Sequence, residues 1–360
     1  MNTATEPVYI KGLSWTDKYF TRTRTALAFN DMNPVVTYRV FMRTPVMLIL
    51  KFVLEYMSKE IGPDKYDFKA FYQEGDIVEA KKPLFEFSGK FQDLVEHETA
   101  ILQLLGWSSV CAYNAWQIRQ AAPKPIRLMD MAARHCPGPH SVIMASYAAF
   151  KGGFDDFSTD IGSSAFGKVG VGTMPHAWIG AFVSTVDSAV AYADAFPDEK
   201  ISVLVDYYGK ELTDSMECYK ALGDRLGSVR IDTHGGRFCE GSEPNEVVAW
   251  NWLQSEYGFT LPMWDCEDPQ HVTGKGVTVE ALYRLRQALN SVGGNKVKIV
   301  VSSGFCLDKV KEFVKFRAPI DVIGTGSFLP VDMRDTYATA DIVAYNGMGK
   351  IKVGREFLCN

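Results

Sequence analysis

A glycine-rich loop at residues 170–178, with the sequence GVGTMPHAW, brings one histidine, His176, to the end of a run of small residues. Small residues let a backbone approach a ligand closely, and successive N–H groups of such a loop bind anionic oxygens. A histidine placed there can accept a phosphoryl group or move a proton near neutral pH. The loop predicts chemistry on an anionic substrate, with a purely structural histidine as the alternative.

Two acidic residues follow apolar, β-branched runs that are typical of buried strands. Asp206 lies in VLVDYY (203–208) and Asp232 in RIDT (230–233). Carboxylates at two strand ends could hold ribose hydroxyls or a Mg²⁺ ion that carries phosphate oxygens. Capping of the following helix is the alternative, because Asp is a common N-cap residue. The sequence leaves both roles open.

Hydroxyl and glycine residues follow the last two predicted strands, as SSG (302–304) and GTG (324–326). Such residues at the last two strand–helix loops form the usual phosphate site of α/β barrels. Ordinary tight turns are the alternative, but two such motifs on consecutive units favour a phosphorylated sugar or nucleotide. Arg134, after the first predicted strand, could pair with a carboxylate or phosphate, and taken alone it is equally well a surface arginine.

Alternating strands and helices must position these residues. The strands predicted after residue 125 are 126–131, 169–173, 201–206, 229–232, 297–302 and 321–325. Repeated strand–helix units predict a parallel sheet, and a polar residue at nearly every strand end favours a closed barrel with its chemistry at the carboxyl ends.

The pattern of helices and strands expected in the first part of the chain predicts an α+β unit. Its expected elements are a helix (14–30), a strand (35–43), a helix (46–61), two short strands (75–89) and a long helix (97–122). The run AAPKP (121–125) marks the domain boundary. We therefore predict an irregular α/β barrel at 126–334 and an N-terminal α+β domain at 1–125, which the tail 335–360 joins.

Composition and charge argue against several classes of protein. A net charge of -5 argues against a nucleic-acid-binding surface. The seven cysteines are scattered without a C-x-x-C pair, which predicts reduced thiols in a cytoplasmic protein and no structural zinc. No secretory signal is visible, and the apolar stretch 46–57 is too short and too charged to span a bilayer.

These motifs, in this order, resemble the nicotinate phosphoribosyltransferases, within the type II phosphoribosyltransferases that include the quinolinate enzyme. The resemblance covers nearly the whole chain, and its specific segments include EGDIVEAKKPLFEFSG (74–89), GGFDDFSTDIGSS (152–164), GTMPHAW (172–178) and RIDTHGGR (230–237). It implies synthesis of nicotinate mononucleotide and pyrophosphate from nicotinate and phosphoribosyl pyrophosphate in NAD salvage, coupled to ATP hydrolysis. It also implies Mg²⁺ and a homodimer with shared active sites.

The resemblance also implies a role for each matching residue. His176 would be phosphorylated from ATP, and Asp206 and Asp232 would act on the ribose or metal side. The implied substrate-binding residues are Tyr19, Phe20, Arg134, Ser158, Thr159 and Thr173, with Tyr19 and Phe20 reaching into a neighbouring subunit's site. The implied phosphate-binding residues are Ser303, Gly304, Gly324, Thr325 and Gly326.

The chain departs from the family at Arg134-His135, where many relatives have two arginines, and at LVDYYGKE (204–211) around Asp206. Nicotinamide and quinolinate are therefore alternative substrates. Quinolinate, with two carboxylates, would need more Arg and Lys, whereas nicotinamide would favour a carboxylate such as Asp155, Asp156 or Asp160. A non-catalytic nucleotide-binding barrel is the alternative from another functional class.

Overall fold

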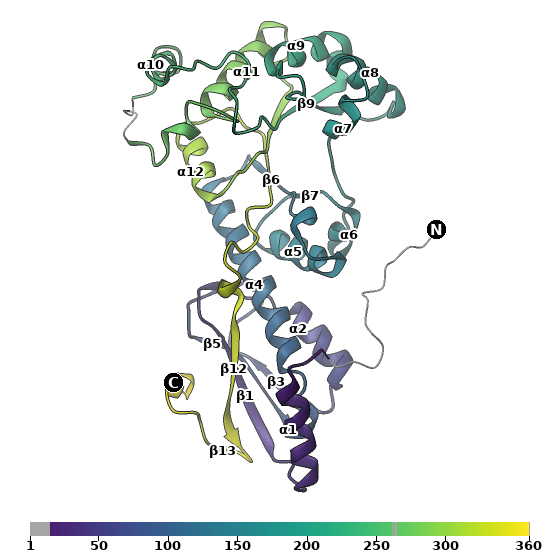
Figure 1. Ribbon diagram of the computed structural model, residues 1–360, viewed down its shortest axis with the longest axis vertical. Coiled ribbons are helices and arrows are strands. Elements are labelled where there is room, and N and C mark those ends of the chain that lie inside the picture. Colours follow the sequence, from purple (N-terminus) through teal and green to yellow (C-terminus); the bar gives the residue numbers. More distant parts are fainter. Residues whose placement is uncertain (1–14, 261, 263–264, 360) are drawn as a thin grey trace.

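The chain forms an elongated molecule with an antiparallel sheet at one end and a parallel sheet at the other (Figure 1). This computed structural model describes residues 15–260, 262 and 265–359. Most buried apolar side chains of both ends belong to one continuous cluster that runs from Val36 to Phe328 in the sequence. The two sheets are therefore joined by packed side chains and not by a linker alone.

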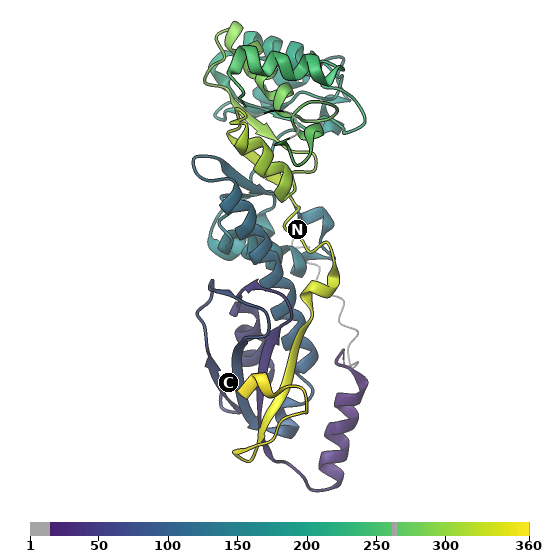
Figure 2. The same cartoon turned by 90° about the vertical axis from the view of Figure 1, so that its left-hand side faces the viewer.

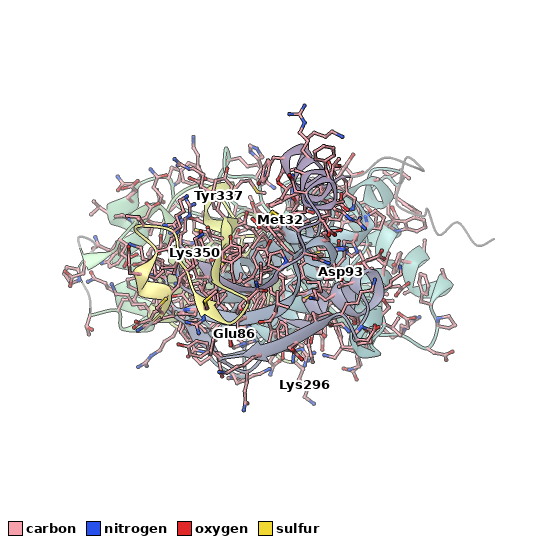
Figure 3. The ribbon with its side chains drawn as sticks, turned by 90° about the horizontal axis from the view of Figure 1, so that it is seen from below. Met32, Glu86, Asp93, Lys296, Tyr337 and Lys350 are labelled. Carbon is pink, nitrogen blue, oxygen red and sulfur yellow. The ribbon has the colours of Figure 1, made fainter. Side chains whose placement is uncertain are left out.

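The N-terminal sheet has five strands in the order β13-β12-β1-β5-β3. Along β1, Val36, Tyr38 and Val40 are buried and alternate with more exposed residues, as expected for a sheet with one covered face. The strands are β1 (Val35–Met42), β3 (Tyr66–Ala70), β5 (Pro83–Lys90), β12 (Ala338–Tyr345) and β13 (Met348–Gly349). Figure 3 looks onto this end of the molecule, with Glu86 of β5 and Lys350 after β13 labelled.

β12 brings the C-terminal tail into the N-terminal sheet. It pairs antiparallel with β1, with Ala338 opposite Met42 and Tyr345 opposite Val36. The chain passes close to the long helix on its way there, because a Cβ built on Gly106 would lie 1.9 Å from the carbonyl oxygen of Thr336. Glycine is therefore required at position 106 for this close approach.

Helices cover the N-terminal sheet and connect it to the rest of the chain. α4 runs between the two sheets, and α1 stands beside the N-terminal sheet in Figure 2. A two-stranded sheet of β2 (Val46–Met47) and β4 (Ile77–Val78) lies near the amino end of α2. The helices are α1 (Lys18–Phe29), α2 (Lys51–Tyr56) with a π-helical turn (Met57–Ile61), α3 (Phe91–Leu94) and α4 (Glu98–Ala121).

The second sheet is parallel throughout and has the order β7-β6-β11-β10-β9-β8. The strands are β6 (Arg127–Asp130), β7 (Asp156–Phe157), β8 (Ile201–Leu204), β9 (Leu226–Ile231), β10 (Lys298–Val301) and β11 (Val322–Thr325). The predicted fold class is confirmed. The barrel is open, however, because β7 and β8 are the two edges of the sheet and do not pair with each other.

Helices follow the strands as the alternation predicts. They are α5 (Pro139–Lys151), α6 (Asp160–Ser163), α7 (His176–Ile179), α8 (Thr185–Ala195), α9 (Glu211–Leu222), α10 (Glu246–Tyr257), α11 (Val279–Ser291) and α12 (Leu307–Lys315). Short 3₁₀ turns add Ala133–His135 after β6 and Pro269–His271 before α11.

Two sequence expectations about elements were wrong, and some strands were not expected. Residues 169–173 form no strand: Val169 is 78% exposed, and Gly170 and Gly172 favour an irregular loop. The helix expected over 46–61 begins at Lys51, because Val46 and Met47 pair with β4 instead. The strands β2, β3, β7, β12 and β13 were not predicted, and β7 has only two residues.

Candidate active site

Polar residues of the parallel sheet meet at the carboxyl ends of its strands. Asp130 and Thr325 end β6 and β11, Asp232 and Ser302 directly follow β9 and β10, and Asp206 lies two residues after β8. Because all these strands run in the same direction, their ends share one edge of the sheet. This is the edge at which α/β barrels carry their chemistry.

A cavity of about 290 Å³ opens at this edge. It brings together seven of the predicted site residues: Arg134, Asp232, Ser303, Gly304, Gly324, Thr325 and Gly326. Ser302, which belongs to the predicted SSG motif, also lines the cavity, and residues that the sequence reasoning did not assign complete the wall: Met131, His135, Arg230 and Ser327. The cavity thus combines two guanidinium groups with the loops that were predicted to bind phosphate.

Arg230 is the main site residue that sequence reasoning missed. Its side chain is 12% exposed and pairs with Asp232, with 2.7 Å between Nη2 and Oδ2. It also donates from Nε to Ser302 Oγ (3.0 Å) and from Nη1 to Thr173 Oγ1 (3.2 Å), while Ser302 Oγ donates to Asp232 Oδ1 (2.8 Å). The available signal was its spacing, since residues two apart on a strand face the same side.

His176 forms a pair with Asp206. The distance between His176 Nε2 and Asp206 Oδ2 is 3.0 Å, and the histidine side chain is 45% exposed whereas the aspartate is 8% exposed. A carboxylate that accepts from Nε2–H leaves the lone pair of the ring on Nδ1. The other carboxylate oxygen, Asp206 Oδ1, is buried without a hydrogen-bond partner among the described residues. The pair therefore offers one nucleophilic nitrogen and one unsatisfied acceptor.

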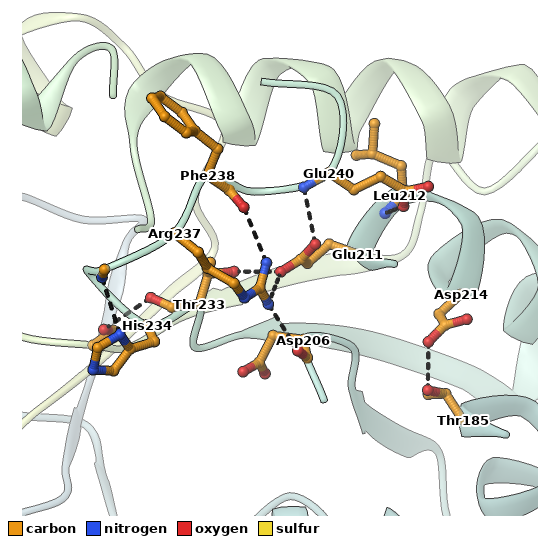
Figure 4. A network of polar contacts seen from close by, with 12 residues as sticks. Thr185, Asp206, Glu211, Leu212, Asp214, Thr233, His234, Arg237, Phe238 and Glu240 are labelled. Carbon is orange, nitrogen blue, oxygen red and sulfur yellow. Dashed lines mark hydrogen bonds and ion pairs between the residues drawn. The ribbon is translucent and has the colours of Figure 1, made fainter. Parts of the chain in front are cut away.

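A buried ion pair holds the loops on which Asp206 and Asp232 stand (Figure 4). Glu211, fully buried at the start of α9, accepts from the guanidinium of Arg237 and from Thr233 Oγ1 (2.8 Å). Arg237 also donates to the main-chain oxygen of Asp206 (2.8 Å), and the Glu240 N–H donates to Glu211 Oε2 (3.0 Å). The ends of β8 and β9 are thereby tied to one carboxylate.

The two glycine-containing loops have different local roles. Ser303 and Gly304 have φ values of +73° and +71°, and Ser303 Oγ donates to the carbonyl oxygen of Thr233 (3.2 Å). The hydroxyl of Thr325 donates to the Phe305 carbonyl (2.7 Å) and accepts from the Ser327 N–H (2.9 Å). Its hydroxyl thus joins the two loops to each other, so the Thr325 side chain fixes the cavity wall.

Asp130 is a second residue that was not predicted. It is 2% exposed, accepts from the Ala132 N–H (2.7 Å) and from Ser146 Oγ (2.6 Å), and burial raises the pKa of its carboxyl. These bonds fix the turn that presents Arg134, whose side chain is exposed at the mouth of the cavity.

Some predicted substrate residues lie outside this cavity. Thr159 caps α6, with its Oγ1 accepting from the Gly162 N–H (3.1 Å), and the exposed Ser158 donates its N–H to the Asp130 carbonyl (3.0 Å). Tyr19 and Phe20 lie in α1, at the other end of the molecule (Figure 1), and are 59% and 8% exposed. The substrate roles of these four residues stay predictions.

Across residues 15–260, 262 and 265–359, no group of three or more His, Cys, Asp or Glu side chains is arranged to hold a metal ion. Nor does any helix within that part of the chain have the length and apolar character needed to cross a membrane.

Comparisons with known proteins point to one group of enzymes. Residues 17–109 match the family model for the N-terminal domain of quinolinate phosphoribosyl transferase. Nicotinate phosphoribosyltransferase 2 of Arabidopsis thaliana is 36% identical over 124 residues, which are 34% of this chain and 22% of that protein. Nicotinate phosphoribosyltransferase pncB2 of Mycobacterium tuberculosis is 24% identical over 78% of this chain and 52% of its own length. The chain thus spans between about a fifth and a half of these curated relatives.

Two solved structures extend the likeness over the whole fold. Nicotinate-nucleotide pyrophosphorylase from Pyrococcus furiosus has a TM-score of 0.74 and 26% identity, over 94% of this chain and 77% of that one. Human nicotinic acid phosphoribosyltransferase has a TM-score of 0.66 over 94% of this chain and 76% of the human chain. At 18% identity, the human structure supports the fold alone.

Proposed function

We propose that this chain is a nicotinate phosphoribosyltransferase of the type II phosphoribosyltransferases. It would join nicotinate to phosphoribosyl pyrophosphate and release nicotinate mononucleotide and pyrophosphate, in the salvage of NAD. The pyridine nitrogen attacks the anomeric carbon of the ribose as the bond from that carbon to the pyrophosphate oxygen breaks. Positioning of the two reactants and stabilisation of charge account for most of the catalysis.

One observation carries this proposal: the cavity at the strand ends is built for anions. The glycine-containing loops and the guanidinium of Arg230 line the same 290 Å³ space. Because Arg230 is balanced by Asp232 and Ser302, its guanidinium is held in one orientation before substrate arrives. A ribose 5-phosphate group fits the chemistry of these loops, with Asp232 close enough to the same wall to accept from ribose hydroxyls.

The acidic residues suit a Mg²⁺ ion that arrives with the substrate. Protein sites for Mg²⁺ commonly supply one or two carboxylates and leave the other positions to water and phosphate oxygens. Asp206 Oδ1 is a buried acceptor with no hydrogen-bond partner in the described part of the chain, and Asp232 lies at the neighbouring strand end. When bound there, Mg²⁺ would neutralise the charge that develops on the departing pyrophosphate.

His176 suits the coupling of ATP hydrolysis to this transfer. Nδ1 would attack the γ-phosphorus of ATP, the bond to the ADP oxygen would break, and the proton on Nε2 would stay in place. Asp206 balances the positive charge that the ring gains in this step, because its Oδ2 accepts from Nε2 at 3.0 Å. Water would later hydrolyse the phosphohistidine and return inorganic phosphate.

The surroundings of three aspartates favour nicotinate over nicotinamide. Asp155, offered as an acceptor for the carboxamide, is already paired with Arg119 (2.6 Å) and Lys124, and Asp156 is paired with Arg127 (2.7 Å). Asp160 accepts from the Gly170 N–H (2.8 Å). All three carboxylates thus have structural partners.

Arg134 likewise favours one carboxylate on the pyridine over two. It is exposed at the cavity mouth, whereas the guanidinium of Arg230, the other arginine of the wall, is already paired with Asp232. Quinolinate would bring a second carboxylate without a further unpaired arginine in this wall.

Steady-state rates test the proposal and its alternatives. The purified protein would be assayed with phosphoribosyl pyrophosphate and Mg²⁺ on nicotinate, nicotinamide and quinolinate, each with and without ATP. We expect kcat/KM to be highest for nicotinate and to rise when ATP is added. A preference for nicotinamide or quinolinate would assign the site to that pyridine. Binding of phosphoribosyl pyrophosphate without turnover of any of the three would favour the non-catalytic barrel.

A further inference from the structure

A buried lysine stands behind the loop of Ser303 and Gly304. Lys309, in the first turn of α12, is 8% exposed, and its Nζ donates to the carbonyl oxygen of Ser303 at 3.2 Å. Its Nζ lies 4.7 Å from the ring centre of Phe305 and 5.6 Å from that of Phe313. The ion pairs found among the described residues do not include Lys309. A buried ammonium without a carboxylate at ion-pairing distance is costly, and an anion bound in front of this loop would offset part of that cost.

The loop in front of Lys309 has a conformation that needs support. Ser303 is not glycine, yet its φ is +73°, and Gly304 follows with +71°. Such a backbone is unfavourable for a residue that carries a Cβ atom. Two hydrogen bonds stabilise this loop. Lys309 Nζ donates to the carbonyl oxygen of Ser303, and Ser303 Oγ donates to the carbonyl oxygen of Thr233. Both loop residues line the cavity at the strand ends, whereas Lys309 does not.

We propose that Lys309 is a positioning residue for the 5′-phosphate of the phosphoribosyl substrate. Its ammonium fixes the Ser303 carbonyl, which keeps the N–H groups of this loop available to phosphate oxygens, and it places a positive charge behind them. In a site of low dielectric such a charge attracts a dianion strongly although it does not touch it. The inference rests on the proposed function, because it requires a phosphate in this cavity.

The charge on Lys309 makes phosphate binding depend on pH. Burial lowers the pKa of its amine to about 8, against the opposing influence of Cys306, Asp232 and Asp268. His271 is a further titratable group near this amine, and it is itself influenced by Asp268, Glu312 and Asp308. A bound dianion favours the charged amine and raises its pKa, so affinity is highest below pH 8 and falls as the free amine loses its proton.

Calorimetric titration with ribose 5-phosphate tests this inference on Lys309→Met, with Lys311→Met as the control. Lys311 lies on the same helix, is 48% exposed and pairs with Asp308 at the surface. The phosphate monoester has a second pKa of about 6, so it is a dianion from pH 7 to 9. Wild type and Lys311→Met should bind about threefold more weakly at pH 9 than at pH 7. Lys309→Met should bind roughly tenfold more weakly at pH 7 and show no such fall. Equal affinities of Lys309→Met and wild type would overturn the inference.

Lysine labelled with ¹³C at Cε gives a second measurement that needs no variant to fold. Addition of ribose 5-phosphate to wild type should raise the titration midpoint of Lys309 and leave that of Lys311 unchanged. An unchanged Lys309 midpoint at saturating ligand would overturn the inference while leaving the proposed function intact. If wild type binds no ribose 5-phosphate, both the proposed function and the role of Lys309 are wrong.

Discussion

The bond between Asp206 and Nε2 leaves Nδ1 of His176 as the ring nitrogen that can react. Incubation with γ-labelled ATP should therefore put an acid-labile label on the wild type and none on His176→Ala. His234→Ala is the control: His234 is another exposed histidine at a strand end, but its Nδ1 accepts from the Gly236 N–H at 3.0 Å. His234→Ala should label like the wild type. Equal labelling of His176→Ala and wild type would remove His176 from the reaction.

Arg134 offers an exposed guanidinium at the cavity mouth that Asp130 orients through the turn at Ala132. If it pairs with the nicotinate carboxylate, Arg134→Ala should lower kcat/KM for nicotinate by about 2 kcal/mol, roughly thirtyfold. Arg22→Ala, a change at an exposed position on α1, should leave kcat/KM within about twofold. A similar kcat/KM for Arg134→Ala and wild type would make Arg134 a surface residue.

At the scale of elements, Glu211 joins the ends of β8 and β9 through Arg237 and Thr233. Glu211→Ala leaves the Arg237 guanidinium, which is 36% exposed, without its partner and should lower the free energy of unfolding by about 2–3 kcal/mol. Glu217→Ala on the same helix removes an exposed pair with Lys220 and should cost less than about 1 kcal/mol. Urea denaturation measures both, and equal losses would contradict the buried role of Glu211.

The first turn of α4 carries a carboxyl whose ionisation opposes folding. Burial raises the pKa of Glu98 to about 7, with Asp341 and Asp17 adding to the rise. The folded protein binds more protons at Glu98 than the unfolded chain between about pH 4.5 and 7, so this residue costs stability as pH rises through that range. Glu98→Gln should raise the free energy of unfolding at pH 8 by about 2–3 kcal/mol, and the gain should shrink toward pH 5. A gain that is equal at both pH values would contradict the assigned pKa.

The strand–helix alternation was sufficient to predict the elements that carry the site, because apolar runs that end in Asp, Ser or Thr are distinctive. β6, β8, β9, β10 and β11 lie where the sequence indicates, each within a few residues. The sequence could not predict that the barrel is open. Closure would require the two edge strands, β7 and β8, to pair with each other, and the sequence of neither strand shows whether they do. β7 was missed because two residues are too few to show an alternating pattern. Residues 169–173 were wrongly predicted as a strand because their valines suggested one, whereas these valines face solvent.

The site residues likewise fall into those that a local sequence pattern predicts and those that it does not. Most residues at strand ends were predicted from position, although Asp130 at the end of β6 was missed, whereas Arg230 acts from within β9 and Glu211 and Lys309 act from the first turns of α9 and α12. Their roles depend on partners far away in sequence, such as Thr173 for Arg230 and Ser146 for Asp130. Distant pairing of this kind has no local signal in one sequence.

At the scale of the whole molecule, Tyr19 is exposed and belongs to α1, which lies at the opposite end from the parallel sheet (Figure 1). An exposed aromatic ring suits an anchor in a partner subunit's site, so we propose a homodimer with shared sites. Inactive Tyr19→Ala and His176→Ala, refolded together, should regain about a quarter of wild-type activity, because half the dimers are mixed and each has one intact site. Each variant refolded alone is the control. No recovery in dimers confirmed by light scattering would place Tyr19 outside a shared site.

The ratio of ADP to nicotinate mononucleotide tests the central claim most directly. Wild type would be given radiolabelled nicotinate, phosphoribosyl pyrophosphate, Mg²⁺ and ATP, and both products would be counted during steady turnover. We expect nicotinate mononucleotide to form with about one ADP for each molecule, as a single phosphoryl transfer to His176 per cycle requires. His176→Ala should form the mononucleotide more slowly and without ADP. If wild type forms no nicotinate mononucleotide, with or without ATP, the site does not perform this reaction.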